Sequence, residues 1–262
     1  MELIRSRDNP RLKLLHGLAH SARDRRKSGQ TLLDGAHLIT AALAARWPLQ
    51  MLVVSESGMA SAEIAGLLTR IPETVERVLL PDALFAHVSP VDSPSGVLAR
   101  IGWPLSRSPV QPFADSVIVL DRVQDPGNLG TILRTAAAAG VGDALLTEGC
   151  AQAWSPRVLR AGMGAHFALR IHEQVDALSL LASFPGPRLA TALGGGARPL
   201  YDFDLRIPVA WMFGAEGQGL SDGLLAAADG RVIIPMPGAI ESLNVGAAVA
   251  ICLFEQVRQR RR

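Results

Sequence analysis

Cysteine is scarce in this chain, and clustered metal ligands are missing. The 262 residues include two cysteines, Cys150 and Cys252, which have no CxxC spacing. This spacing excludes a disulfide scaffold and a cysteine-based structural zinc site. The six histidines are scattered, and no HExxH pair occurs. We therefore expect no metal in this protein.

Long hydrophobic runs are also missing. The start, Met1 to Arg11, alternates charged and apolar residues and has no hydrophobic signal region. The longest apolar stretch, Val245 to Phe254, is far shorter than the about 20 residues that cross a bilayer. The sequence therefore predicts a soluble, cytoplasmic protein of a reducing compartment, without membrane association.

The net charge is small, but its distribution is uneven. Apolar residues make up 48% and charged residues 19% of the chain, so a large core is available and wholesale disorder is excluded. The formal charge is +2, yet residues 1–30 carry eight basic and three acidic groups, and residues 255–262 carry four and one. A basic end can contact RNA or simply be a solvated face, so charge alone leaves both readings open.

The order of predicted elements indicates two α/β domains. Residues 1–102 form the first, which begins with a basic helical leader. A stretch rich in proline, serine and arginine at residues 103–115 is typical of a linker. Residues 116–262 alternate strand and helix, which predicts a mostly parallel sheet covered on both faces. The last helix is expected over Ser242 to Gln259.

Three glycine-marked turns follow strands of the second domain, where open α/β sheets place their ligand sites. They read DRVQDPGNLGTILRTA from Asp121, FGAEGQGLS from Phe213, and IIPMPGAIESLNVGA from Ile233. Any one of them alone is more often a tight turn than a ligand loop. Three at successive strand ends indicate a small-molecule site. An ordinary dinucleotide fold and a P-loop are disfavoured because neither glycine fingerprint is complete.

These three motifs, in this order, resemble the signature motifs of the SpoU (TrmH-like) RNA ribose 2′-O-methyltransferases of the SPOUT superfamily. The resemblance spans residues 116–262. The first domain resembles the family's small ribosomal-protein-like RNA-binding module, on weaker cues such as Ser6-x-x-Asn9-Pro10. The resemblance implies a trefoil-knotted C-terminal domain, S-adenosylmethionine as methyl donor, RNA as substrate and a homodimer.

By position, the resemblance also implies the site residues. The residues that match the family's catalytic site are Asn128, Arg134, Glu216, Ser242 and Asn244. The residues that match its cofactor loops are Thr191, Ala192, Gly214, Ile234, Met236 and Leu243.

Methyl transfer requires an oxygen nucleophile that is aligned with the donor and relieved of its proton. A guanidinium with a pKa above about 12 is a poor general base. Our hypothesis is therefore that Arg134 clamps the adjacent phosphate and stabilises charge on the ribose 2′-oxygen, while Glu216 and Asn128 orient Arg134 and the ribose. Ser242 and Asn244 are expected to shape the pocket through hydrogen bonds.

Several alternatives stay open. The resemblance favours ribosomal RNA over transfer RNA, because relatives with an added N-terminal domain mostly act on the former. A non-catalytic RNA-binding ribosome-assembly factor with the same fold is disfavoured by the intact Arg134, Glu216 and Asn244. A small-molecule enzyme of the doubly wound type would bind nucleotides without RNA, and the basic leader fits RNA better.

Overall fold

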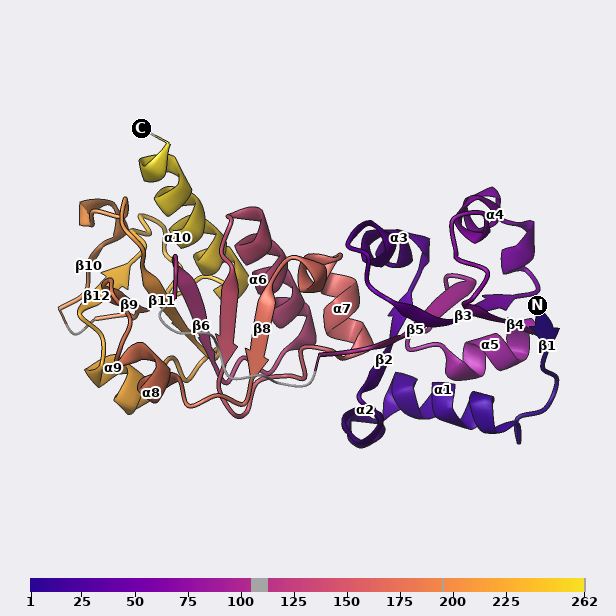
Figure 1. Cartoon of the computed structure of the whole chain (residues 1–262). Helices are drawn as coiled ribbons and strands as arrows, with labels where there is room; N and C mark the ends of the chain where they lie inside the picture. The colour runs from indigo at the N-terminus through magenta and orange to yellow at the C-terminus, as the bar shows by residue number, and fades with distance from the viewer. Residues whose placement is uncertain (105–112, 195, 262) are drawn as a thin grey trace. The chain divides into compact units, whose positions relative to one another are not determined.

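The structure is a computed structural model that describes residues 1–104, 113–194 and 196–261 (Figure 1). Backbone contacts divide these residues into two units. Unit 1 comprises residues 1–104 together with Trp154–Phe167, and unit 2 comprises residues 113–153 and 168–261. Most of the predicted linker at 103–115 lies outside the described residues. The domain boundaries 1–102 and 116–262 stay a prediction.

Unit 1 is built on a mixed five-stranded sheet in the order β1-β4-β3-β5-β2. Only β5 runs antiparallel to its neighbours, and the pairs β1·β4 and β3·β4 are parallel. The strands are β1 (Glu2–Leu3), β2 (Gln30–Asp34), β3 (Leu49–Ser55), β4 (Glu76–Leu80) and β5 (Val97–Gly102). The α-helices are α1 (Pro10–His20), α2 (Ala22–Ser28), α3 (Ala36–Ala44), α4 (Ala62–Leu68), α5 (Asp82–Val88) and α7 (Pro156–Gly162). Short 3-10 turns lie at Gly58–Ala60 and Ala165–Phe167.

The basic leader folds as two helices, α1 and α2. The Asn9 side chain accepts the Arg11 N–H at 2.9 Å, and Pro10 occupies the first turn, so the start of α1 is capped as its sequence indicates. Ser21 ends α1 and caps α2, and Gly29 closes α2 at a φ of 62°. The leader therefore turns at Ser21 instead of continuing as one rod.

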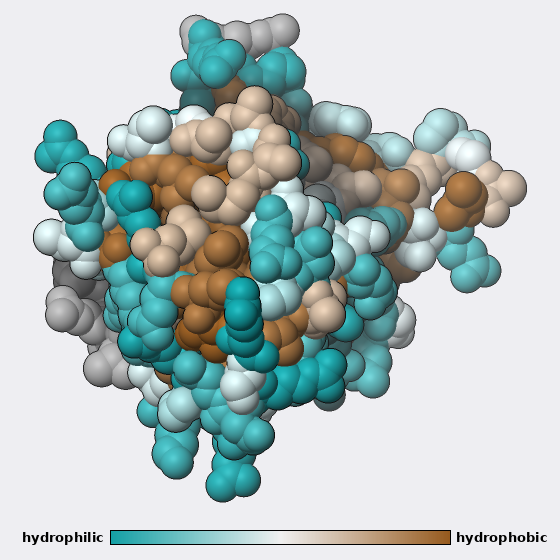
Figure 2. Space-filling model, turned by 90° about the vertical axis from the view of Figure 1, so that its right-hand side faces the viewer, coloured by the Kyte–Doolittle hydropathy of each residue, from teal (hydrophilic) through white to brown (hydrophobic). Residues whose placement is uncertain are grey.

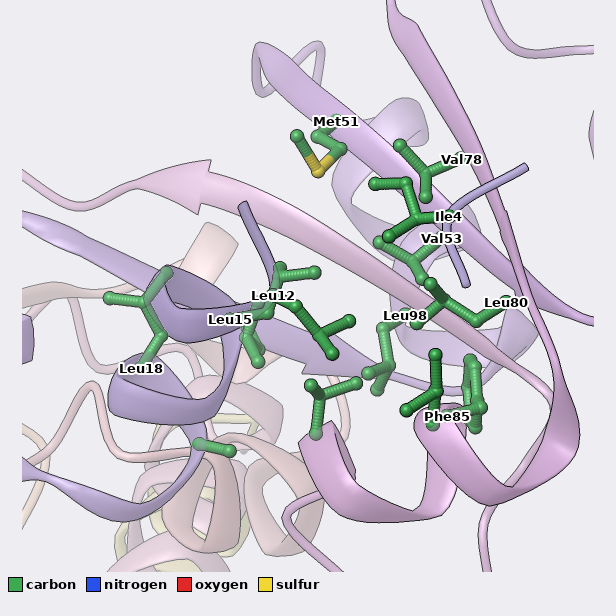
Figure 3. Packing of buried hydrophobic residues seen from close by; sticks show 14 residues of the cluster. Ile4, Leu12, Leu15, Leu18, Met51, Val53, Val78, Leu80, Phe85 and Leu98 are labelled. Atoms are coloured by element: carbon green, nitrogen blue, oxygen red, sulfur yellow. The ribbon is translucent and has the colours of Figure 1, made fainter. Parts of the chain in front are cut away.

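Leucines of α1 anchor the leader in the core of unit 1. Leu12, Leu15 and Leu18 share the face that the 3.6-residue period predicts, and each is at most 1% exposed. All three belong to one cluster of buried residues that also includes Phe85 of α5 and Leu98 of β5 (Figure 3). A fully buried leucine contributes about 1.5–3 kcal/mol, so the three leucines bind α1 firmly to the sheet.

The segment Trp154–Phe167 packs in unit 1 although it lies far along the chain. The Thr31 hydroxyl of β2 donates to the Trp154 carbonyl at 2.7 Å. Arg160 of α7 pairs with the buried Asp34 carboxylate at 2.7 Å. Because β2 supplies both partners, the segment Trp154–Phe167 is fixed to strand β2 by directed polar contacts.

One face of unit 1 carries an apolar area. Figure 2 views the molecule from the side of β1 and the N-terminus, and apolar side chains gather in the middle of this face within a hydrophilic border. Met1, Leu3 and Met59 are large apolar residues of unit 1 with exposures of 39–52%. No helix among the described residues is long and apolar enough to cross a membrane.

Unit 2 is built on a seven-stranded sheet in the order β10-β12-β9-β11-β6-β7-β8, in which every pair is parallel. The strands are β6 (Val117–Asp121), β7 (Asp143–Leu146), β8 (Arg170–Glu173), β9 (Arg188–Thr191), β10 (Arg198–Pro199), β11 (Ala210–Gly214) and β12 (Gly230–Ile233). The α-helices are α6 (Pro126–Ala138), α8 (Ala177–Leu181), α9 (Asp222–Ala226) and α10 (Val245–Arg260), and a 3-10 turn lies at Leu200–Asp202.

Alternate residues of the central strands face opposite helix layers. Val119 and Met212 pack in one cluster with Leu181 of α8 and Leu224 of α9. On the other face, the Trp211 ring nitrogen donates to Gln256 of α10 at 2.9 Å. The predicted mostly parallel sheet with both faces covered is confirmed, because central strands buried on both sides read as continuous apolar runs.

The predicted start of the last helix is wrong. Helix α10 begins at Val245, not at Ser242, and its N-cap is Asn244. The Asn244 side-chain oxygen accepts the N–H groups of Gly246 and Ala247 at 2.9 and 3.3 Å. Since Asn244 satisfies these free donors, the residues before it stay in a loop.

Candidate active site

The carboxyl ends of strands β9, β11 and β12 border one cleft, which lies wholly within unit 2. Its volume is about 790 Å³, within the about 300–1,000 Å³ typical of small-molecule sites. All six residues that match the family's cofactor loops line it, as do three of the five catalytic candidates. These are Thr191, Ala192, Gly214, Ile234, Met236 and Leu243, and Glu216, Ser242 and Asn244.

The loop after β11 folds back onto its own start. A Cβ at Gly214 would lie 2.0 Å from the Gly219 carbonyl carbon and 2.2 Å from the Leu220 nitrogen, so only glycine fits there. Gly217 and Gly219 hold φ angles of 79° and 67°, which favour glycine. The glycines therefore shape a compact loop that presents Glu216 at its tip.

Asn128, Glu216 and Asn244 form a hydrogen-bonded network. The amide groups of Asn128 and Asn244 both donate to Oε1 of Glu216, the latter at 3.2 Å. The Asn244 amide also donates to Oδ1 of Asn128 at 2.9 Å. Three segments separated by 88 and 28 residues thus meet in one polar cluster.

Each member of the Asn128–Glu216–Asn244 network is held by its own element. Asp125 caps α6 by accepting the Asn128 N–H at 2.7 Å, with Pro126 following it in the first turn. Asn244 is the N-cap of α10 and therefore cannot rotate without uncapping that helix. The network joins the N-terminus of α6 to the N-terminus of α10 beside the cleft.

The structure places the two remaining catalytic candidates apart from this network. Arg134 is exposed on α6, six residues after Asn128, and it is not among the described residues that line the cleft. Ser242 is exposed in the loop before α10 and lines the cleft. In the described part of the chain, Glu216 accepts hydrogen bonds from two asparagines and contacts Arg134 in none of them.

A buried aspartate that sequence reasoning did not single out secures the Glu216 loop. Asp121, the last residue of β6, is 3% exposed. Its carboxylate accepts the Ser221 N–H at 2.7 Å and the Thr147 hydroxyl at 2.9 Å. Because Ser221 ends the glycine loop, Asp121 fixes that loop to the strand beside it. An acidic residue ending an otherwise apolar strand was the available signal.

The two cysteines have no catalytic features. Burial raises the pKa of the Cys150 thiol, and burial raises that of Cys252 to about 12. Both stay protonated at neutral pH and are therefore poor nucleophiles. Within residues 1–104, 113–194 and 196–261, no group of three or more histidine, cysteine or carboxylate side chains is arranged to hold a metal ion.

An all-parallel sheet with a cleft at its strand ends and an amide–carboxylate network beside the cleft is typical of an α/β protein that binds a small molecule. The motifs that build the cleft and network also carry the family resemblance. The chain belongs to the SpoU rRNA Methylase family, whose pattern matches residues 115–254. Residues 9–99 match the MRM3-like substrate binding domain. The expected SpoU-family RNA ribose 2′-O-methyltransferase, with S-adenosylmethionine as its methyl donor, is confirmed.

Curated relatives match over nearly the whole chain. The chain is 31% identical to a 23S rRNA (guanosine(2553)-2′-O)-methyltransferase of Bacillus subtilis, over 97% of this chain and 98% of the relative. It is 29% identical to a 23S rRNA (uridine(2479)-2′-O)-methyltransferase of Streptomyces viridochromogenes, over 96% and 91%.

Solved structures agree with these matches. A crystal structure of an RNA 2′-O ribose methyltransferase superposes with a TM-score of 0.85 at 32% identity, covering 99% of this chain and all of that one. The SpoU methyltransferase AviRb of Streptomyces viridochromogenes, in complex with AdoMet, gives 0.86 at 26% identity, with coverages of 97% and 98%. The expected fold, with a small N-terminal domain beside a SPOUT-type methyltransferase domain, is confirmed.

Proposed function

We propose that this chain transfers the methyl group of S-adenosylmethionine to a ribose 2′-hydroxyl of ribosomal RNA, in the cytoplasm and without a metal. The observation that carries the proposal is the Asn128–Glu216–Asn244 network at the mouth of the cleft in unit 2. Relatives named as 23S rRNA 2′-O-methyltransferases favour ribosomal over transfer RNA.

The cleft fits an adenosyl sulfonium. Phe213, Leu220 and Val232 provide apolar wall, and the glycine loop exposes backbone groups that can hydrogen-bond a nucleoside. Gly214 lines the cleft and lets the loop close on itself, because a Cβ there would meet the backbone of Gly219 and Leu220. When bound there, S-adenosylmethionine supplies an electrophilic methyl group. The six cofactor-loop residues would hold it.

Side chains at the cleft mouth position the ribose. The side-chain amides of Asn128 and Asn244 donate hydrogen bonds to Glu216, which holds both amides at the entrance of the cleft. Arg134, exposed on the same helix as Asn128, is available to an RNA phosphate and to the 2′-oxygen as its proton leaves through that phosphate or water. Positioning of this kind contributes about 7–11 kcal/mol to a bimolecular reaction.

Substitution of Arg134 tests this role. Arg134→Ala should lower single-turnover methyl transfer to RNA by orders of magnitude, while the affinity for S-adenosylmethionine changes less than about tenfold, or 1.4 kcal/mol. Arg134→Lys should rescue poorly, because a point charge does not reproduce a planar fork on a phosphate. Arg206→Ala, at an exposed arginine paired with Asp204, is the matched control and should leave the rate unchanged.

The competing role for Arg134 is structural. If Arg134 only braces α6, then Arg134→Ala will lower the melting temperature and weaken S-adenosylmethionine binding along with turnover. A folded Arg134→Ala protein with near-normal methyl transfer would remove this residue from the mechanism.

A homodimer through α10 is the second part of the proposal. Val249, Cys252 and Leu253 of α10 are buried, yet Phe254 on the same helix is 47% exposed. A phenylalanine this exposed, with the half-buried Ile251 beside it, favours burial against a symmetric partner. Sedimentation at micromolar concentration should show a dimer, and Phe254→Glu should shift it to the monomer. A wild-type chain that sediments only as a monomer would contradict the proposal.

A further inference from the structure

Three histidines of unit 1 form a ring cluster at the ends of two helices. The His16 and His87 rings stack with centroids 4.2 Å apart and an interplanar angle of 11°. His20 lies against His16 at 4.6 Å. His16 and His20 come from α1 and His87 from α5, and the two helices pack together. His20 is exposed and the other two are half-buried, so the cluster reaches the surface.

The hydrogen bond within the cluster assigns a proton. His16 Nδ1 lies 2.9 Å from the His87 carbonyl oxygen, which can only accept, so Nδ1–H donates to it. A neutral His16 therefore has an acceptor at Nε2, and a protonated His16 has a second donor there. His20 and His87 lie in the last turns of α1 and α5, where the helix dipole favours a cation.

The charges around the cluster are cationic. Burial lowers the pKa of His87, and the fields of His16, Arg7 and His20 lower it further. Two acidic groups of the leader are paired elsewhere, Glu2 with Arg11 and Asp8 with Lys13. The third, Asp24 of α2, is exposed, and its carboxylate lies against Gly17 of α1. On β4, which packs on α5, Glu76 pairs with Arg11.

Further cations of the leader remain uncompensated. None of the ion pairs recorded among the described residues involves five exposed cations of the first 30 residues. They are Arg5, Arg7, Arg23, Arg26 and Lys27. Free arginines outnumber the single free carboxylate of the leader, Asp24, and Arg7 acts on the cluster itself. Such a surface attracts a polyanion, whose negative field favours protonated imidazole rings.

We propose that the cluster of His16, His20 and His87, with Arg7, is a phosphate-contacting RNA surface of unit 1 that takes up protons when RNA binds. The proposal rests on the proposed function, which supplies RNA as the partner. It adds an RNA contact on unit 1, outside the cleft of unit 2. The phosphate backbone of RNA stabilises the imidazolium form, so binding tightens as the pH falls. The opposing reading is that the rings only pack α1 against α5.

The test measures the affinity of the full chain for purified 23S rRNA by filter binding at pH 8 and pH 6 at constant ionic strength. Wild-type affinity should rise about tenfold over this range, equivalent to 1.4 kcal/mol. A variant with His16→Asn, His20→Gln and His87→Gln should lose this rise, with asparagine at 16 retaining a donor for the His87 carbonyl. His37→Gln, at an exposed histidine of α3, is the matched control and should keep it.

A second measurement needs no variant. Imidazole NMR signals of the wild-type chain should show the pKa of the cluster histidines rising when RNA is added, while that of His37 stays constant. The proposal would be overturned if the pKa values of the cluster histidines do not change when RNA is added, or if the triple variant keeps the full pH response. It would also be overturned if poly-glutamate binds as tightly as RNA and loses affinity equally in the triple variant. Single-turnover methyl transfer at saturating RNA should stay normal in the triple variant. Loss of methyl transfer by the wild-type chain would instead refute the proposed function.

Discussion

The two sheets of this chain differ in strand direction, and the difference governs how each unit can bind. In unit 2 all seven strands are parallel, so the loops that follow them gather at one edge and build a cleft. In unit 1 β5 runs against its neighbours, and the loops are divided between two edges. Its leader carries exposed basic side chains on helices α1 and α2. A parallel sheet suits a small donor, and a basic helical surface suits a polyanion.

The largest effect on binding is expected at Gly214 in the cleft of unit 2, where only glycine fits. Gly214→Ala would place a Cβ 2.0 Å from backbone of the same loop, so the loop must open. S-adenosylmethionine affinity measured by calorimetry should fall at least about 100-fold, or 2.7 kcal/mol. Gly238→Ala is the control, because nothing lies within 4 Å of that position. Near-normal affinity in Gly214→Ala would show that the loop is not part of the donor site.

Separating the units should separate S-adenosylmethionine binding from RNA binding. A fragment starting at Asp115 is expected to retain S-adenosylmethionine binding and to lose more than about tenfold of its RNA affinity, because the leader's phosphate contacts are gone. It should also melt at a lower temperature than the full chain, since the segment Trp154–Phe167 loses Thr31 and Asp34 of β2. Undiminished RNA binding by the fragment would contradict the assignment of RNA contacts to unit 1.

A smaller effect should follow from removing the aspartate that secures the Glu216 loop. Asp121→Ala leaves the Ser221 N–H and the Thr147 hydroxyl without their acceptor. We expect urea denaturation to show a loss of about 1–3 kcal/mol in the free energy of unfolding. Asp222→Ala, at an exposed residue next to Ser221, should change it by less than about 0.5 kcal/mol. Equal losses in the two variants would show that the buried carboxylate has no special role.

The smallest effect concerns pH. The pKa of His87 is lowered in the folded chain by burial and by His16, Arg7 and His20. The unfolded chain therefore binds this proton more readily, so the stability due to neutral His87 is present above pH 6.5 and is lost as the pH falls below it. Thermal melts in the absence of RNA should show that His87→Gln flattens the acid side of the stability profile. A His87→Gln profile that follows the wild type would rule out this source of acid sensitivity.

Local patterns predicted the parts of the fold that depend on neighbours in sequence. The stripe of Leu12, Leu15 and Leu18 predicts α1, because the 3.6-residue period is a local property. Strand β8 was not predicted, since Ile171 is its one apolar residue and the strand lies at a sheet edge. The start of α10 was misplaced because serine and asparagine cap equally well, and the side-chain contacts of Asn244 decide between them.

Contacts distant in sequence could not be predicted from periodicity. The motif resemblance identified Asn128, Glu216 and Asn244 but did not show that Glu216 accepts from both amides. The packing of Trp154–Phe167 in unit 1 depends on Thr31 and Asp34, more than 100 residues away. The trefoil knot, the homodimer and the cytoplasmic location stay predictions.

The most direct test of the central claim is the chemical identity of the product. Purified chain should be incubated with unmodified 23S rRNA and isotopically labelled S-adenosylmethionine, and the RNA then digested to nucleosides for mass spectrometry. Label is expected in a single 2′-O-methylribonucleoside, present with the wild-type chain and absent with Arg134→Ala. Label confined to a base, or no label in RNA from a folded chain that binds S-adenosylmethionine, would contradict it.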